Sequence, residues 1–104
     1  MKQERWFSLL GLAFRAGKVV SGEEAVLAAV RNKKARLVLV AGDASARSLK
    51  QWRNKCEHYE VPARVVADRY ELGRAMGKAH RVVIAVNDEG FAGKLTALLD
   101  QYRG

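Results

Sequence analysis

Cys56 and His58 are the first candidates for catalytic or metal chemistry, because Cys56 is the only cysteine and His58 lies two residues away. Two ligands are too few for a zinc site, and a Cys–His nucleophile pair needs both side chains on one side of a helix. Residues i and i+2 of a helix point well apart, and Cys56 falls on the apolar stripe of a predicted helix. We therefore predict a buried thiol and no metal site.

Glu23 and Glu24 are adjacent carboxylates, but neighbouring helical residues diverge and the helix dipole favours acids in a first turn. We predict that Ser21 is the N-cap of a helix and that Glu24 completes its capping box. The glycines form neither the G-x-G-x-x-G turn nor the G-x-x-x-x-G-K-S/T phosphate loop. Gly73 is interpreted as a site of close packing. The sequence thus predicts no cofactor and no enzymatic activity.

Basic residues gather around a predicted helix-to-strand turn. Four of them lie within six positions: Arg31, Lys33, Lys34 and Arg36. Capping of the helix C-terminus needs only one or two cations, so the excess favours a phosphate-binding patch, with Arg15 and Lys18 nearby in sequence. A solvated basic face is the alternative interpretation. Phosphate attraction carries no sequence information, so these residues do not separate RNA from DNA.

The net charge of +8 is concentrated in one half of the chain. Residues 1–56 hold 12 Lys and Arg against 4 Asp and Glu, whereas residues 57–104 hold 7 of each class. Phosphates attract Lys and Arg and release counterions when they are neutralised. The asymmetry therefore favours a polyanionic partner.

Alternating helices and strands must position these residues. Helices are expected over about residues 2–16, 21–32, 45–59 and 68–76 and from Asp88 onward, with Gly17 and Gly77 as C-terminal caps. Strands are expected over 18–20, 37–41, 61–66 and 82–86. The continuous apolar run at 37–41 is typical of a central strand covered on both faces. The alternation predicts a single-domain α/β fold, a three-layer α-β-α sandwich with a mostly parallel, mixed four-stranded sheet.

Composition sets the class of protein and its compartment. The 104 residues are 49% apolar and 29% charged with one proline, so one folded domain over 1–104 is expected. A lone cysteine favours a reducing compartment, and no apolar run approaches the roughly 20 residues that cross a bilayer. We expect a cytoplasmic protein with no membrane partner.

Four segments, in their order and spacing, resemble the kink-turn-binding ribosomal-protein superfamily. They are residues 16–24 (AGKVVSGEE), 35–41 (ARLVLVA), 56–62 (CEHYEVP) and 71–78 (ELGRAMGK). The resemblance covers nearly the whole chain and is closest to the bacterial YlxQ-like branch, which carries the Ser-Gly-Glu-Glu start of the second helix. It implies an α-β-α sandwich that grips a sharply bent RNA.

The resemblance also implies where RNA binds, namely at the start of the second helix and at a loop before the last strand. Here these are Gly22 to Arg31 and Gly77 to Arg81. Helix N-terminal amides can meet phosphates, and polar side chains there can reach purine edges. In the loop, Lys78 and Arg81 can contact phosphate, whereas His80 either stacks on a base or belongs to an exposed polar turn.

The second helix departs from the family pattern Gly-x-Asn-Glu-x-x-Lys. Gly22 matches, but Glu24, Ala25 and Ala28 stand where the amide, the acid and the cation are expected. Glu24 can accept from guanine N–H groups but cannot donate, and Arg31 lies one turn beyond Ala28 on roughly the same face. Arg31 therefore partly replaces the missing cation.

We predict a non-enzymatic protein that binds structured, kink-turn-like RNA, ribosomal or ribosome-associated, and acts as a monomer. The expected contacts are at Lys18, Gly22, Glu23, Glu24, Arg31, Lys33, Lys34, Arg36, Lys78, His80 and Arg81. The alternative is a protein-interaction or dimerisation module on the same fold, which Glu24, Ala25 and Ala28 favour.

Overall fold

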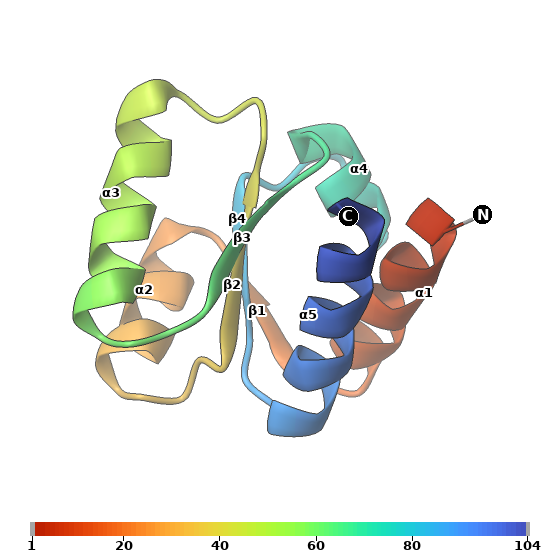
Figure 1. Ribbon diagram of the computed structural model, residues 1–104, viewed down its shortest axis with the longest axis horizontal. Helices are drawn as coiled ribbons and strands as arrows, with labels where there is room; N and C mark the ends of the chain where they lie inside the picture. The colour runs from red at the N-terminus through yellow and green to blue at the C-terminus, as the bar shows by residue number, and fades with distance from the viewer. Residues whose placement is uncertain (1, 104) are drawn as a thin grey trace.

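The computed structural model describes residues 2–103, and side chains within residues 5–101. Five helices alternate with four strands (Figure 1). In chain order they are α1 (Lys2–Arg15), β1 (Val19–Ser21), α2 (Glu23–Arg31), β2 (Leu37–Ala41), α3 (Ala46–His58), β3 (Ala63–Val66), α4 (Arg69–Arg74), β4 (Val83–Val86) and α5 (Glu89–Arg103). The expected elements are all present, with boundaries shifted by one to a few residues.

The sheet has the strand order β1-β4-β2-β3. β4 is antiparallel to both β1 and β2, and only β2 and β3 form a parallel pair. The expectation of a mostly parallel sheet is therefore wrong. β1, β2 and β3 do run in one direction, but β4 is inserted between two of them and runs the other way.

The connection between β3 and β4 differs from the two connections before it. α2 and α3 have 9 and 13 residues and carry the chain back along the sheet, as parallel crossovers require. α4 has six residues, about 9 Å of helix, which is shorter than a four-residue strand of about 13 Å. β4 starts at the end of the sheet where β3 finishes and runs back, antiparallel to β2.

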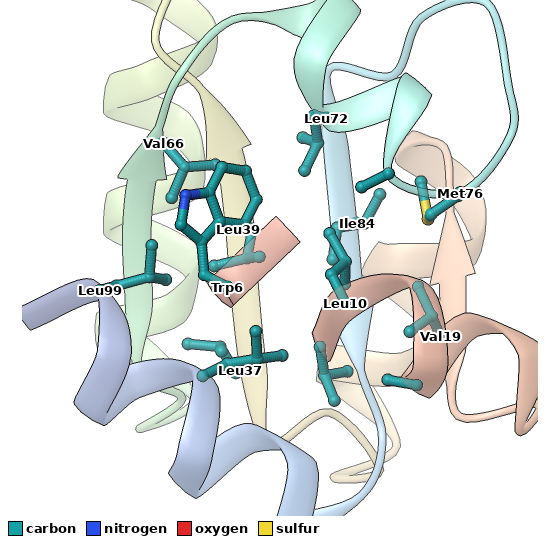
Figure 2. Close-up of a cluster of buried hydrophobic side chains, with 14 of the residues drawn as sticks. Trp6, Leu10, Val19, Leu37, Leu39, Val66, Leu72, Met76, Ile84 and Leu99 are labelled. Atoms are coloured by element: carbon teal, nitrogen blue, oxygen red, sulfur yellow. The ribbon is translucent and has the colours of Figure 1, made fainter. Parts of the chain in front are cut away.

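Helices cover both faces of the sheet, as Figure 1 shows: α2 and α3 lie on one side, and α1, α4 and α5 on the other. The period-two alternation of strand side chains separates the two cores. Leu37, Leu39 and Ile84 pack with Trp6, Leu10 and Leu99 on the α1 side (Figure 2). Val38, Val40 and Val83 pack with Trp52 and Cys56 on the α3 side. β2 is buried over its whole length, which confirms its central position.

Glycines end α1 and α4, as the sequence predicts. Gly17 has φ 76° and Gly77 has φ 70°. After each glycine the next amide donates to a carbonyl of the preceding helix: Lys18 N to Ala13 O at 3.0 Å and Lys78 N to Gly73 O at 2.9 Å. These are left-handed caps for which glycine has no steric penalty. Asp68 caps α4 by accepting from the amides of Tyr70 and Glu71, both at 2.9 Å.

Within the part of the chain that the structure describes, no helix is long and apolar enough to cross a membrane.

Candidate functional site

α2 begins at a sharp turn rather than at a side-chain cap. Gly22 is the N-cap residue, with φ 96°, and no side chain accepts a hydrogen bond from the first amides of the helix. The first intrahelical bond runs from Val26 N to Gly22 O at 3.0 Å, so the amides of residues 23–25 precede it. These amides form the positive end of the helix dipole and are available to an anion or an acceptor.

The predicted capping box of Ser21 and Glu24 is therefore wrong. Ser21 is the last residue of β1, paired with Ile84, and its backbone is held in the sheet before the chain turns at Gly22. Its hydroxyl accepts instead from Arg81 Nε at 3.1 Å. Glu24 is exposed in the first turn and is not a cap.

The loop 77–81 lies against the start of α2. Arg81 is fixed by three contacts: Nε to Ser21 Oγ, Nη1 to His80 O at 2.6 Å, and its backbone amide to Arg69 O at 2.9 Å. Arg69 is itself held by Asp43, with Nε 3.1 Å from Oδ2. The loop is thus tied both to the end of β1, next to the start of α2, and to the start of α4.

Gly73 fixes the approach of α4 to this loop. A Cβ at residue 73 would lie 2.6 Å from His80 Cα and 2.8 Å from His80 N. The interpretation of Gly73 as a site of close packing is therefore confirmed, and it bears directly on the position of His80.

The two segments meet in one shallow open pocket of about 380 Å³, lined by Ser21, Gly22, Glu23, His80, Arg81, Val82 and Val83. The amide of Gly22 donates to Val83 O at 3.1 Å and so joins the helix start to β4. Four predicted site residues, Gly22, Glu23, His80 and Arg81, are brought together here although almost sixty residues separate the segments. We call this surface the α2–loop site.

Tyr70 is a candidate that the sequence reasoning missed. Its side chain is 62% exposed, and its ring meets the ring of His80 edge-to-face with centroids 6.4 Å apart. An exposed aromatic beside a histidine offers a stacking surface to an unpaired base. The only local sign that Tyr70 is exposed is its place between charged residues in the first turn of α4. Its contact with His80 depends on the tertiary fold.

Lys78 lies on the α1 side of the loop. Its Nζ is 5.7 Å from the centroid of the Phe14 ring, and the side chain is exposed. Lys78 therefore extends the positive surface of the loop away from α2 and towards α1.

The other predicted cations lie at the opposite end of the strands. Arg36 N donates to Val86 O and Asn87 N donates to Lys18 O, both at 2.8 Å, so Lys18 and Arg36 flank consecutive residues at the end of β4. Arg31 ends α2, and Lys33 and Lys34 follow it, all exposed. The nine residues of α2 separate this group from the α2–loop site by about 13 Å. We call Lys18, Arg31, Lys33, Lys34 and Arg36 the distal basic group.

Cys56 is buried, and burial raises the pKa of its thiol from 9.0 to about 11. The thiolate is the nucleophilic form, so a raised pKa makes Cys56 inert at neutral pH and confirms the interpretation of a core thiol. Among the described side chains, no group of three or more His, Cys, Asp or Glu residues can hold a metal ion.

Together the fold and the site define a small α-β-α sandwich whose exposed helix start and neighbouring loop form one surface. Residues 4–96 match the family model described as ribosomal protein L7Ae/L30e/S12e/Gadd45 family. The chain therefore belongs to this family, and the resemblance seen in the four sequence segments is confirmed.

Relatives and a solved structure agree with this assignment. RNA-binding protein YlxQ of Bacillus subtilis (strain 168) is 53% identical over 96% of this chain and 100% of its own length. The large ribosomal subunit protein eL30 of Yarrowia lipolytica is 32% identical over 86% of this chain and 84% of its own. A solved structure, described as a protein with unknown function from Bacillus halodurans C, has a TM-score of 0.89 at 49% identity and covers 91% of this chain and 96% of that one.

Proposed function

We propose that this protein is a cytoplasmic, monomeric, non-enzymatic RNA-binding protein. It forms one domain over residues 1–104 that holds a kink-turn-like structured RNA of the ribosome or of ribosome-associated complexes. Family membership, the RNA-binding name of the Bacillus subtilis relative and the ribosomal name of the Yarrowia relative support the RNA class. The charge excess of residues 1–56 supports a polyanionic partner.

The juxtaposition of α2 and loop 77–81 carries the proposal. Gly22 and Glu23, at the uncapped start of α2, line the same pocket as His80 and Arg81, and Tyr70 lies beside His80. Amides and Arg81 suit phosphates or base acceptors, while the two rings suit an unstacked base. A bent RNA presents phosphates and an unstacked base close together, whereas a regular A-form duplex keeps its bases stacked.

The mechanism is capture of a shape. The protein binds the bent RNA conformer more tightly than the extended one, and the population shifts by the difference in affinity. Gly73 packs against the backbone of His80, and Arg81 binds Ser21 next to the start of α2, so the binding surface is largely formed before RNA arrives. A preformed surface reduces the ordering that binding must offset.

Exposed carboxylates shape the specificity of the α2–loop site. Glu23 and Glu24 occupy the first turn of α2 and repel phosphates, but each can accept hydrogen bonds from guanine N–H groups. Lys78, Arg81 and the distal basic group therefore make the phosphate contacts. Within that group, Arg31 replaces the cation that is missing at residue 28.

A titration of two RNAs tests this function. A kink-turn duplex and a matched straight duplex are titrated with the protein at two salt concentrations, with binding followed by fluorescence anisotropy. The kink-turn duplex should bind about tenfold more tightly at both salt concentrations, which corresponds to about 1.4 kcal/mol. Equal affinities for the two duplexes would contradict shape capture.

A protein-interaction module is the second candidate, because the outer face of α2 exposes Glu23, Glu24, Ala25 and Ala28 rather than cations. Size-exclusion chromatography with light scattering, run with and without the kink-turn duplex, separates the two functions. A stable homodimer that does not change with RNA would favour the second candidate.

A further inference from the structure

A groove of about 690 Å³ runs between α1 and the end of α4, outside the α2–loop site. One face of α1 and the end of α4 line it, and the lining includes Phe7, Gly11, Phe14, Arg15 and Arg74. Its volume lies in the range of about 300–1,000 Å³ that is usual for pockets binding small molecules. We call it the α1–α4 groove, and both helices lie on the same side of the sheet in Figure 1.

Helical spacing and one glycine shape the groove. Phe7, Gly11 and Phe14 are four and three residues apart, so they share one face of α1. A Cβ at Gly11 would lie 2.9 Å from Ala75 O, and the missing side chain lets α1 approach the end of α4. The floor of the groove is therefore close-packed, and the rings of Phe7 and Phe14 lie on either side of it along the helix.

Two aromatic rings and several cations determine its chemistry. The guanidinium carbon of Arg74 is 6.0 Å from the Phe7 ring centroid, and Lys78 Nζ is 5.7 Å from that of Phe14. Arg15 also lines the groove, and none of the lining residues is a carboxylate. Leu12 is 51% exposed at its rim. Aromatic faces beside unopposed cations are the combination that binds bases and phosphates of single strands.

The two cation–π contacts do not block such a ligand. Arg74 and Lys78 are exposed, and a cation–π contact at an exposed site contributes only about 0.5–1 kcal/mol. A phosphate offers each cation a charge-assisted contact of at least similar strength, so the side chain can turn from the ring to the phosphate. Phe7 and Phe14 are half-buried and pack against the core, so a base can then stack on the exposed part of each ring.

The loop 77–81 links the α1–α4 groove to the α2–loop site. Gly77 lines the groove, and three and four residues further along the same loop His80 and Arg81 line the other pocket. Lys78 lies between them in sequence and reaches over Phe14. A strand of RNA that leaves the α2–loop site along this loop therefore meets the groove directly.

We propose that the α1–α4 groove binds unstacked nucleotides of a single-stranded segment that continues from the structured RNA. This inference rests on the proposed function and extends it to the partner's form: a bent duplex with an adjoining single strand. Bases stack on Phe7 and Phe14, and Arg15, Arg74 and Lys78 contact the phosphates.

A tailed RNA tests the groove. The kink-turn duplex is compared with the same duplex carrying a single-stranded tail of about six uridines, placed in turn on each end. For the wild-type protein, one of the two tails should raise affinity about tenfold, the effect of one stacked base. Phe7→Leu, which keeps an apolar side chain but removes the ring, and Arg74→Ala should each reduce this gain to less than about threefold.

A variant on the other side of the sheet is the matched control. Lys50 is exposed on α3, and Lys50→Ala removes one cation without touching the groove, so it should retain the tenfold gain. Thermal unfolding of each variant confirms that it folds. A tail labelled with 4-thiouridine should crosslink to residues 7–15 or 74–78.

The outcomes distinguish the two proposals. A gain below twofold from both tails on wild-type protein, an unchanged gain in both groove variants, or crosslinks confined to α3 would overturn the proposal that the α1–α4 groove binds single-stranded RNA. If kinked and straight duplexes bind equally well and the tail still raises affinity, shape capture is overturned. The proposal that the α1–α4 groove binds a single strand then still holds.

Discussion

Arg81 Nε donates a hydrogen bond to Ser21 Oγ at 3.1 Å and thereby links the loop before β4 to the end of β1. The two residues are sixty positions apart, and between them they fix both halves of the α2–loop site. The serine hydroxyl that the sequence predicts as a helix cap is used for this link. Arg81 is thus a positioning residue as well as a cation.

Removal of this hydrogen bond should loosen the site without unfolding the protein. Ser21→Ala should lower the free energy of unfolding by about 0.5–1.5 kcal/mol, the net contribution of a typical hydrogen bond. Arg81→Ala should lower it further, because this change also removes the hydrogen bond from Nη1 to His80 O. A double-mutant cycle measured by urea unfolding should give a coupling energy of similar size. Additive effects of the two substitutions would show that the hydrogen bond does not contribute.

The absence of a side-chain cap on α2 predicts that Glu24 has little effect on stability. Glu24→Ala should change the free energy of unfolding by less than about 0.5 kcal/mol, as at ordinary surface sites. Asp68→Ala is the matched comparison, because Asp68 accepts from two amides of α4 and its loss should cost about 1 kcal/mol. Thermal unfolding measures both, and an equal loss would restore a capping role to Glu24.

Substitution of Gly73 should disturb the loop through packing. Gly73→Ala forces its Cβ against the backbone of His80 and should cost about 1–3 kcal/mol, with weaker binding of the kink-turn duplex. Gly93→Ala in α5 is the control, since a Cβ there meets nothing within 4 Å and alanine should stabilise the helix by about 0.5–1 kcal/mol. Equal melting temperatures for the two variants would contradict the role of Gly73.

Phosphate contacts should appear in the salt dependence of RNA binding. Lys78→Ala and Arg31→Ala should each weaken binding and reduce the slope of log K against log salt by about 0.7–0.9, the value of one lost phosphate contact. The first variant tests the loop and the second the distal basic group. An unchanged slope for either variant would show that the RNA phosphates do not contact that surface.

Alkaline pH should destabilise the protein partly through Cys56. Burial raises the pKa of the folded thiol to about 11, so between 9.0 and about 11 the unfolded chain has lost this proton while the folded chain keeps it. Unfolding then releases a proton, and the free energy of unfolding falls as pH rises through this window. Urea unfolding of wild type and Cys56→Ala should show a steeper fall for wild type. Parallel pH profiles would rule out this contribution.

Much of the fold could be predicted from local patterns. The apolar run at 37–41 and the helical spacing of Trp52 and Cys56 reflect which residues must be buried, and the structure places them in the core. Gly17 and Gly77 end their helices because only glycine adopts positive φ without strain. These signals depend on near neighbours in the chain, so one sequence suffices to read them.

Strand direction and the meeting of distant segments were decided by the tertiary structure. β4 runs antiparallel to β2 and β1, and no local pattern within β4 predicts that direction. The same arrangement brings Arg81 to Ser21 and separates the cations into the loop and the distal basic group. The sequence by itself determined the helices, the strands, the buried thiol, the surplus of positive charge and the family. Which charges share a surface was determined only by folding, because it depends on contacts between residues far apart in the chain.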